Sequence, residues 1–254
     1  MRSNATLLLV AARSVTLCAR RRSAPAPTTI DKRRLAGPVV EEACAAIQQV
    51  LQAHPPGRLF VQLGSAWSRL MVLPWVDQLT SEDRWGNYAR ARFEQVYGDD
   101  SDGWELRLAR DLPGRGRLAV AWPAALGTEL RRHKSVRSVR LALLEHLGLL
   151  LEHEPQFSGC VLELEANGAG FLLLVDGEIR RVRWCRFGDA EGLLAAVRSE
   201  WVAVESAEAF EPLQPPALAL APPAPERRSE RGRIAGVVAS GLGFGRSFAL
   251  PGWV

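Results

Sequence analysis

The chain has 254 residues, of which 47% are hydrophobic and 24% charged, a composition typical of a folded protein with a sizeable core. It excludes a wholly disordered chain, and no heptad or Gly-X-Y period indicates a coiled coil or collagen. The net charge is +4, and among 32 basic residues only Lys32 and Lys134 are lysines. Such uniform use of arginine is more typical of a GC-rich coding sequence than of a nucleic-acid surface, which should cluster on one face.

Two short strands are predicted at the beginning of the chain. Residues 6–10 and 15–19 are apolar and β-branched, and residues 11–14 form the expected turn. A secretion signal is the alternative, because Arg2 precedes an apolar run. However, Arg13 interrupts that run and no clean small-x-small cleavage site follows it. The pattern therefore favours a hairpin.

The next segments alternate between helical and strand patterns, as in an α/β domain. We expect, in chain order, a connector at 23–29, a helix from 38 to 53, a hairpin of 59–63 with 69–73, and a helix from 82 to 97. In the second helix Trp85, Ala89, Phe93 and Tyr97 recur every fourth residue, which predicts one buried face. Thr80 and Ser81 are the expected caps of this helix and Gly98 its stop.

The second half of the chain continues the alternation. We expect a strand pair at 104–108 and 117–121, a short helix at 123–132, a strand at 136–139, a helix at 141–152, three strands at 160–165, 171–175 and 178–184, and a last helix at 189–201. After Glu211 the chain is rich in Pro and Gly and has no sustained period. We expect residues 206–254 to be a disordered tail.

No motif of a hydrolase, a metalloenzyme or a P-loop protein is present. His146 and His153 lie seven residues apart, about 10.5 Å along a helix, which is too far for one small cation. The run from Gly241 to Gly245 resembles a phosphate loop only in its glycines. No apolar run approaches the ~20 residues of a membrane-spanning helix, so we expect a soluble chain. Four scattered cysteines are predicted to be buried thiols in a reducing compartment: Cys18, Cys44, Cys160 and Cys185.

Two groups of basic residues are candidate surfaces for phosphate backbone, anionic lipid or an acidic peptide. The first group is Arg131, Arg132, Lys134, Arg137 and Arg140. The second is Arg180, Arg181, Arg183 and Arg186. The pattern favours solvated faces, because alternation in the second group places Val182 and Trp184 on the opposite side of a strand.

Local sequences at two places resemble a known family. Leu73-Pro74-Trp75 and the run ARARFEQVYG at 89–98 resemble a signature of small proteobacterial pilus-cluster proteins. These are similar to the actin-like (ribonuclease-H-like) assembly components PilM of type IV pili and GspL of type II secretion. The resemblance covers about residues 59–187. It implies an α/β, two-lobed actin-like fold with mixed sheets: a first lobe at 1–135, a second, truncated lobe at 136–205, and the tail at 206–254.

The resemblance also implies where a nucleotide phosphate would lie. In PilM-like proteins a second-lobe hairpin carries a phosphate-binding turn, and its degenerate counterpart here falls on Asn167, Gly168 and Gly170. Glu163 and Glu165 replace the Asp and first Gly of that motif, and a carboxylate at Glu165 would repel a phosphate. The first-lobe turn at 11–14 also lacks the Gly and Asp of a phosphate loop. We therefore expect a pseudo-ATPase without cofactor, metal or catalytic residues.

The function implied is a non-enzymatic cytoplasmic scaffold in the inner-membrane assembly platform of a type IV pilus or type II secretion system. The resemblance implies that it is peripheral to the membrane and binds a cytoplasmic segment of an inner-membrane protein; no nucleic-acid partner is expected. Two alternatives remain open: a weak actin-like ATPase whose loops have drifted, and an arginine-rich module that binds nucleic acid or lipid.

Overall fold

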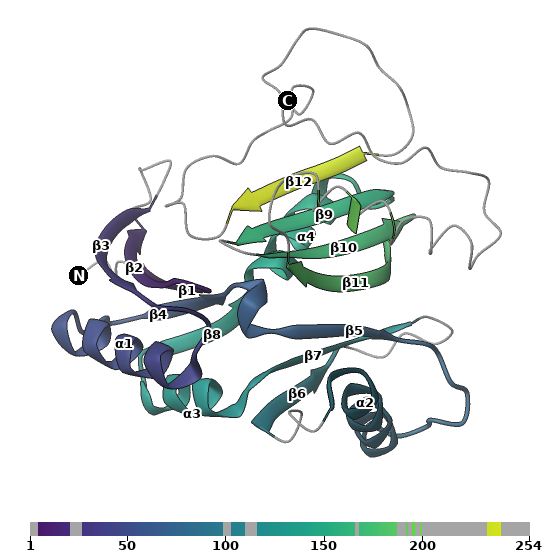
Figure 1. The fold of residues 1–254 in the computed structure, drawn as a ribbon, viewed down its shortest axis with the longest axis horizontal. Helices are drawn as coiled ribbons and strands as arrows, with labels where there is room; N and C mark the ends of the chain where they lie inside the picture. The colour runs from purple at the N-terminus through teal and green to yellow at the C-terminus, as the bar shows by residue number, and fades with distance from the viewer. Residues whose placement is uncertain are drawn as a thin grey trace, which may run out of the picture.

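A computed structural model describes residues 5–20, 27–98, 103–109, 116–165, 168–186 and 233–239, with the isolated positions 192, 195, 196 and 199. Figure 1 shows three sheets within this part of the chain. Four helices of the described residues accompany them. No helix in these ranges is long and apolar enough to cross a bilayer.

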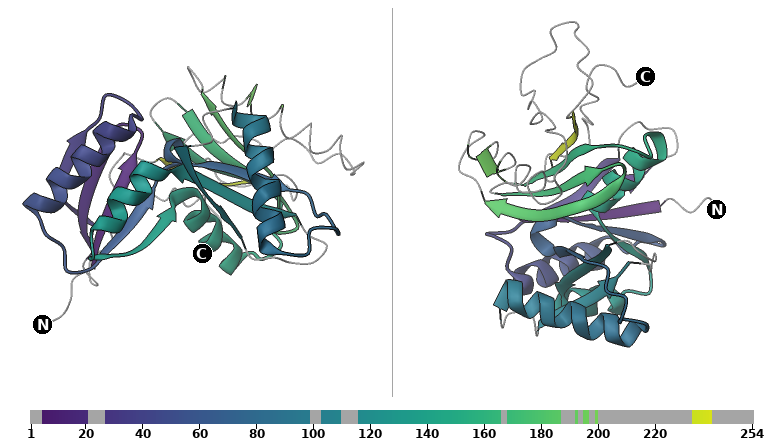
Figure 2. Two further views of the ribbon diagram at one scale, coloured as in Figure 1. Left: turned by 90° about the horizontal axis from the view of Figure 1, so that it is seen from below. Right: turned by 90° about the vertical axis from the view of Figure 1, so that its right-hand side faces the viewer.

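The first sheet has five strands in the order β3-β2-β1-β4-β8. Its strands are β1 (Ala5–Ala11), β2 (Ser14–Arg20), β3 (Thr28–Arg34), β4 (Leu59–Leu63) and β8 (Val136–Leu141). β1, β2 and β3 are antiparallel, whereas β4 is parallel to both β1 and β8, so the sheet is mixed. Helices α1 (Val40–Ala53) and α3 (Ala124–Arg132) lie on the same side of it (Figures 1 and 2). Ile47 and Leu126 are buried in that core.

The second sheet is antiparallel, in the order β5-β7-β6. Its strands are β5 (Arg69–Leu73), β6 (Trp104–Leu108) and β7 (Arg117–Pro123), and helix α2 (Glu82–Tyr97) packs across one face (Figure 2). Trp85, Ala89 and Phe93 on α2 are buried, which confirms most of the predicted face, whereas Tyr97 at its end is only partly buried. The Ser81 hydroxyl accepts the Arg84 N–H, and Gly98 ends the helix at φ 75°, a conformation that favours glycine.

The third sheet has the order β11-β10-β9-β12. Its strands are β9 (Gly159–Glu165), β10 (Gly168–Val175), β11 (Glu178–Arg186) and β12 (Arg233–Ala239), with helix α4 (Ala142–His153) against it. β9, β10 and β11 are antiparallel, and β12 is parallel to β9. This order repeats β3-β2-β1-β4 of the first sheet, so the third sheet is its structural duplicate.

Four expectations need correction. Residues 59–63 and 69–73 do not form a hairpin, because the 3-10 turn η1 (Ser65–Trp67) sends β5 into a different sheet. The expected connector at 23–29 runs into an additional strand, β3. The strand at 136–141 pairs with β4, so the division at residue 135 separates strands of one sheet.

The fourth correction concerns the tail. Seven of its residues, Arg233–Ala239, form β12 and pair with β9, because a parallel strand can satisfy the open edge of the third sheet. The other residues of the expected tail at 206–254 lie outside the described residues, as does most of the expected helix at 189–201.

Candidate functional site

The three sheets meet at a seam around η1, the short turn that connects β4 to β5. On one side of η1 lies the turn between β1 and β2, and on the other lie β9 and β10. Figure 1 shows β5 and β11 running next to each other. Because η1 contacts β1, β9 and β10 and leads along the chain into β5, side chains here can link all three sheets.

The Glu165 carboxylate lies at the centre of this seam. Its Oε2 accepts the backbone N–H of Ala12 at 2.8 Å, and its Oε1 accepts that of Ala66 at 2.7 Å. Glu165 is 6% exposed. Burial raises the pKa of Glu165 above its ordinary value of 4.5, and the two N–H bonds oppose that rise only in part. One carboxylate from the third sheet thus satisfies donors from the β1–β2 turn and from η1.

Glu163 makes a second contact across the seam. It is fully buried, and its Oε2 accepts a hydrogen bond from the Ser65 hydroxyl of η1. Glycines permit this close approach: a Cβ at Gly170 would collide with the Ser65 side chain, and one at Gly64 would lie 2.6 Å from Glu165 Oε1. The two glutamates therefore connect β9 to η1, and the glycines provide the space they need.

The residues predicted as a degenerate phosphate turn do not share one turn. Gly168 and Gly170 lie within strand β10, and Asn167 falls outside the described residues. A Cβ at Gly168 would collide with the ring of Trp184 on the neighbouring strand. Both glycines are explained by close packing, so a substitution at either would disturb the seam whether or not a ligand binds.

The β1–β2 turn, where the resemblance implies the first phosphate loop, presents the Ala12 N–H to Glu165. A nucleotide phosphate would need such N–H donors, and here a buried carboxylate of the chain already occupies this one. The seam as it stands does not fit a bound nucleotide.

A narrow cleft opens beside the seam, between β5 and β11. It is lined by residues from η1, β5, α2, α4, β10 and β11, among them Ser68, Arg69, Tyr97 and Trp184. The Arg69 guanidinium carbon lies 5.9 Å from the centre of the Tyr97 ring, 5.1 Å from that of Trp104 and 5.8 Å from that of Trp184. These distances are within the range of cation–π attraction.

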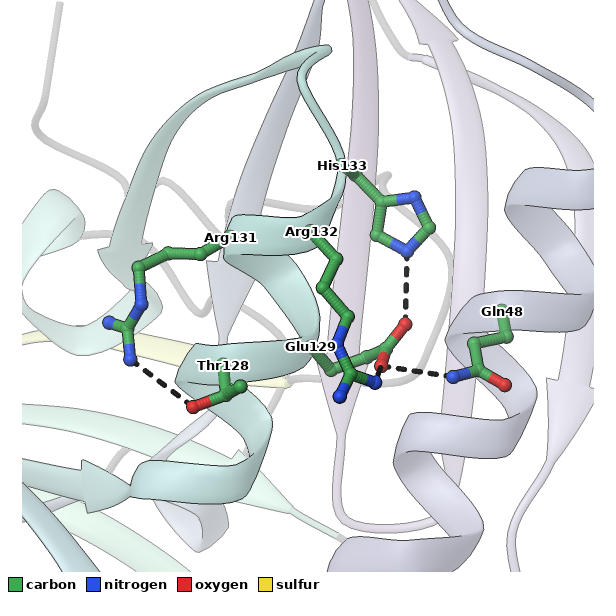
Figure 3. A network of polar contacts seen from close by, with 6 residues as sticks. All are labelled: Gln48, Thr128, Glu129, Arg131, Arg132 and His133. Carbon is green, nitrogen blue, oxygen red and sulfur yellow. Dashed lines mark hydrogen bonds and ion pairs between the residues drawn. The ribbon is translucent and has the colours of Figure 1, made fainter.

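The first basic group is largely bound to carboxylates. Figure 3 shows Glu129 between α1 and α3, where it accepts hydrogen bonds from Gln48 at 2.9 Å and Arg132 at 2.9 Å and lies 3.1 Å from a ring nitrogen of His133. Burial alone would raise the pKa of Glu129, but these bonds lower it overall. Arg131 also contacts Thr128 at 3.4 Å.

Two further carboxylates, those of Glu105 and Glu145, pair with arginines of the first basic group. Arg131 bonds Glu105 at 2.6 Å and Arg140 bonds Glu145 at 2.8 Å. In the second group, Arg180 lies 3.4 Å from Glu178. This pairing reduces the positive potential that a nucleic-acid or lipid surface requires, in line with the solvated-face interpretation.

The histidines and cysteines are separate from the seam. His146 and His153 each contact, through Nδ1, the carbonyl of the residue four positions earlier in α4. Cys18 and Cys160 are buried, whereas Cys44 and Cys185 are partly exposed. The run from Gly241 to Gly245 lies outside the described residues.

Glu163, Glu165 and the turn at 11–14 that contains Ala12 were recognisable in the sequence, but the other residues of the seam and the cleft were not. Ser65 and Ala66 sit in a turn with no recognisable motif, and Arg69 begins an ordinary apolar strand. The sequence pattern identified Trp184 only as an apolar residue on one face of a predicted strand. Their meeting depends on how two sheets pack, which leaves no local signal along the chain.

The chain resembles solved structures in fold, but its overall sequence is not closely similar to that of a known protein. No protein-family model and no curated protein matches the chain. A protein of unknown function with an actin-like ATPase fold from Bacteroides thetaiotaomicron matches with TM-score 0.56 and 8% identity, over 80% of this chain and 78% of that one. The cytoplasmic domain of EpsL, an inner-membrane component of the type II secretion system of Vibrio cholerae, matches with TM-score 0.50 and 10% identity, over 96% and 88%.

A PilM–PilN type IV pilus biogenesis complex also matches, with TM-score 0.48, 15% identity, and 82% and 70% coverage. At such identities the first two matches show the fold alone. Together with the duplicated mixed sheets, they establish that this chain has the α/β actin-like fold that its local sequences imply.

Proposed function

We propose that this chain is a cytoplasmic scaffold in the inner-membrane assembly platform of a type IV pilus or type II secretion system. It acts by binding a cytoplasmic segment of an inner-membrane protein and does not hydrolyse nucleotide. The sequence resemblance and the fold shared with the cytoplasmic domain of EpsL support the choice of system.

The observation that carries the non-enzymatic part is the position of Glu165. Its carboxylate takes the N–H groups of Ala12 and Ala66 and is buried between them. A phosphate would have to displace this side chain and then lie near Glu163, a second buried acid. An anionic phosphate is repelled by a nearby carboxylate, most strongly in a poorly solvated site. Both effects disfavour nucleotide binding.

Isothermal titration of the full chain with Mg-ATP tests the absence of nucleotide binding. We expect no submillimolar binding by the wild-type protein. The Glu165→Ala variant is the informative companion, because it frees both N–H groups and removes the negative charge. Submillimolar binding and turnover by the wild-type chain would overturn the scaffold proposal in favour of the weak ATPase.

Co-purification tests the docking part. The full chain is co-expressed with each inner-membrane protein encoded beside its gene, and the membrane fraction is solubilised and purified through the partner. We expect one such protein to retain the chain, and to lose it when its cytoplasmic segment is deleted. If deletion of that segment leaves the association unchanged, the chain does not dock in the proposed way.

A further inference from the structure

The Glu165 carboxylate is bound within the seam as a free anion would be bound. Each of its oxygens accepts one backbone N–H, Oε2 from Ala12 at 2.8 Å and Oε1 from Ala66 at 2.7 Å. The side chain is 6% exposed, and among the described residues no lysine or arginine forms an ion pair with it. Its charge is therefore stabilised by backbone N–H groups, which are donors that proteins also use to hold separate carboxylates and phosphates.

The two donors and the acceptor belong to different parts of the molecule. Ala12 lies in the turn between β1 and β2 of the first sheet, and Ala66 lies in η1, which leads into the second sheet. Glu165 is the last residue of β9 in the third sheet, 153 residues from Ala12 and 99 from Ala66 along the chain. Because the sheet that carries the acceptor places neither donor, the pair of N–H groups is a site and the carboxylate is its ligand.

Contacts that do not involve Glu165 hold the two donors near each other. The Gly64 N–H donates to the Val10 carbonyl at 2.8 Å, which fixes the start of η1 to β1 next to the turn. Within η1 the Trp67 N–H donates to the Gly64 carbonyl at 3.0 Å. Gly64 also leaves room for the ligand, since a Cβ there would lie 2.6 Å from Glu165 Oε1. We therefore expect the two-donor site to persist when the carboxylate is removed.

A second carboxylate connects the first sheet to the third in a different way. β8 ends at Leu141 and α4 begins at the next residue, so the chain passes directly from the first sheet to the helix that packs on the third. On α4, Glu145 accepts hydrogen bonds from Gln62 Nε2 at 2.8 Å and from Arg140 Nη1 at 2.8 Å. These donors are flexible side chains, and the Glu145 side chain is 31% exposed, so water can replace the carboxylate there. Glu145 thus differs from Glu165, which is buried and bound by backbone groups.

We propose that the N–H groups of Ala12 and Ala66 form a carboxylate-binding site whose ligand is tethered to the chain, so that Glu165 fastens the third sheet to the first without a molecule from solution. A tethered group is present at a high effective concentration, which keeps free carboxylates out of the wild-type site. The site is open to small carboxylates in variants that lack the Glu165 side chain. The inference goes beyond the proposed function, because it holds for any partner and any assembly.

Rescue by acetate tests the site. Glu165→Ala removes the same heavy atoms that acetate contains and leaves both N–H groups without their acceptor. The full-chain variant is unfolded with urea in increasing concentrations of sodium acetate at about pH 7, where acetate is ionised. We expect acetate to raise the urea midpoint of Glu165→Ala in a saturable way, since a ligand that binds only the folded state stabilises it. The wild type, whose site is filled, should show no such saturable rise.

Controls separate the site from general effects of salt. Sodium chloride at matched ionic strength should change the midpoints of Glu165→Ala and the wild type equally. Pivalate carries the same charge as acetate but is too bulky for the vacated space, so it should act as chloride does. Inorganic phosphate should be a weaker ligand than acetate, because the buried Glu163 repels a more highly charged anion. Glu145→Ala is the matched variant: it loses a carboxylate between the same sheets, but acetate should not rescue it.

Amide hydrogen exchange, followed by nuclear magnetic resonance, tests the two hydrogen bonds one by one. We expect the Ala12 and Ala66 amides to exchange about tenfold faster in Glu165→Ala, as for the loss of one hydrogen bond each, and to recover in acetate. The Gly64 amide, which donates to Val10, should keep its protection. Glu165→Gln presents one oxygen and one NH₂ group in place of two oxygens, so only one of the two amides should keep its acceptor.

The inference fails if Glu165→Ala folds and acetate does not raise its midpoint, if chloride or pivalate acts as acetate does, or if Glu145→Ala responds equally. It also fails if phosphate is the better ligand, since the site would then not be one for carboxylates. If Glu165→Ala does not fold even in acetate, exchange in Glu165→Gln decides. Protection of both amides as in the wild type would overturn the inference, and loss at one of them would support it.

The proposed function is tested separately. Nucleotide binding and co-purification are measured on the wild-type chain, whereas rescue is measured on Glu165→Ala with acetate. A chain that retains a membrane partner but shows no rescue would keep the scaffold proposal and remove the tethered site. Rescue in a chain that retains no membrane partner would keep the tethered site and remove the scaffold proposal.

Discussion

Two sets of donors lie on either side of η1, and they differ in where the acceptor comes from. At the seam, the N–H groups of Ala12 and Ala66 meet the buried carboxylate of Glu165. In the cleft, the Ser68 hydroxyl and the Trp184 indole meet no acceptor among the described residues. The comparison teaches that the seam pairs its buried donors with a carboxylate of the chain, whereas its neighbour keeps two buried donors without an acceptor among the described residues.

The largest expected effect on stability is at Phe93, which lies outside both the seam and the cleft and serves as a reference for the other variants. Phe93 is 4% exposed beneath α2, so Phe93→Ala should lower the free energy of unfolding by about 3–5 kcal/mol through cavity formation. Urea denaturation measures it. A variant that unfolds at the same urea concentration as wild type would contradict the burial of this face.

Next in size is the loss of the seam carboxylate. Glu165→Ala leaves two N–H groups without their acceptor and should lower the free energy of unfolding by about 2–4 kcal/mol, since an unsatisfied buried donor costs ~1–3 kcal/mol. Equilibrium unfolding checks this, with the exposed Glu94→Ala on α2 as the control that should change little. An equal stability of Glu165→Ala and wild type would show that the seam is not held by this side chain.

A smaller effect depends on pH. Burial raises the pKa of Glu165 in the folded state above its ordinary value of 4.5, so the folded protein binds this proton more tightly than the unfolded chain does. As pH falls through the raised pKa toward 4.5, the wild type should gain stability relative to Glu165→Gln, which does not titrate; as pH rises, that gain should be lost.

Urea unfolding of the two proteins across this pH range gives the difference directly. A stability difference that stays constant with pH, or that changes in the opposite direction, would contradict the raised pKa.

The smallest expected effect is in the cleft. Arg69→Met should change the free energy of unfolding by about 1 kcal/mol or less, because it removes cation–π contacts but also removes the cost of a partly buried charge. Thermal unfolding tests this. A large loss of stability would mean that the contacts of Arg69 with the surrounding rings stabilise the fold.

Local patterns were sufficient for much of the fold. The β1–β2 hairpin follows from the alternation of apolar and polar residues, and the buried face of α2 follows from apolar residues at every fourth position. Both patterns depend only on neighbours along the chain. β3 was missed because its residues are mostly exposed and polar, as at many sheet edges. The hairpin of β4 with β5 was wrong because two short apolar runs predict two strands but not the sheet to which each belongs.

The candidate site could be predicted only in part. Glu165 was recognised as a misplaced charge, since a carboxylate at a phosphate position is visible in the sequence itself. Its contact with Ala66 was not, because 99 residues separate them and no local rule relates their positions. The cleft was not predicted at all.

The sequence by itself determined the class of fold, the short-range elements and the lack of a phosphate-binding signature, because these depend on composition, periodicity and the identity of single residues. Only the tertiary structure decided that β12 completes the third sheet, that Glu165 fills the seam, and that Ser68, Arg69 and Trp184 line one cleft. Sheet order and packing set these contacts, and both result from the burial of surfaces contributed by distant parts of the chain.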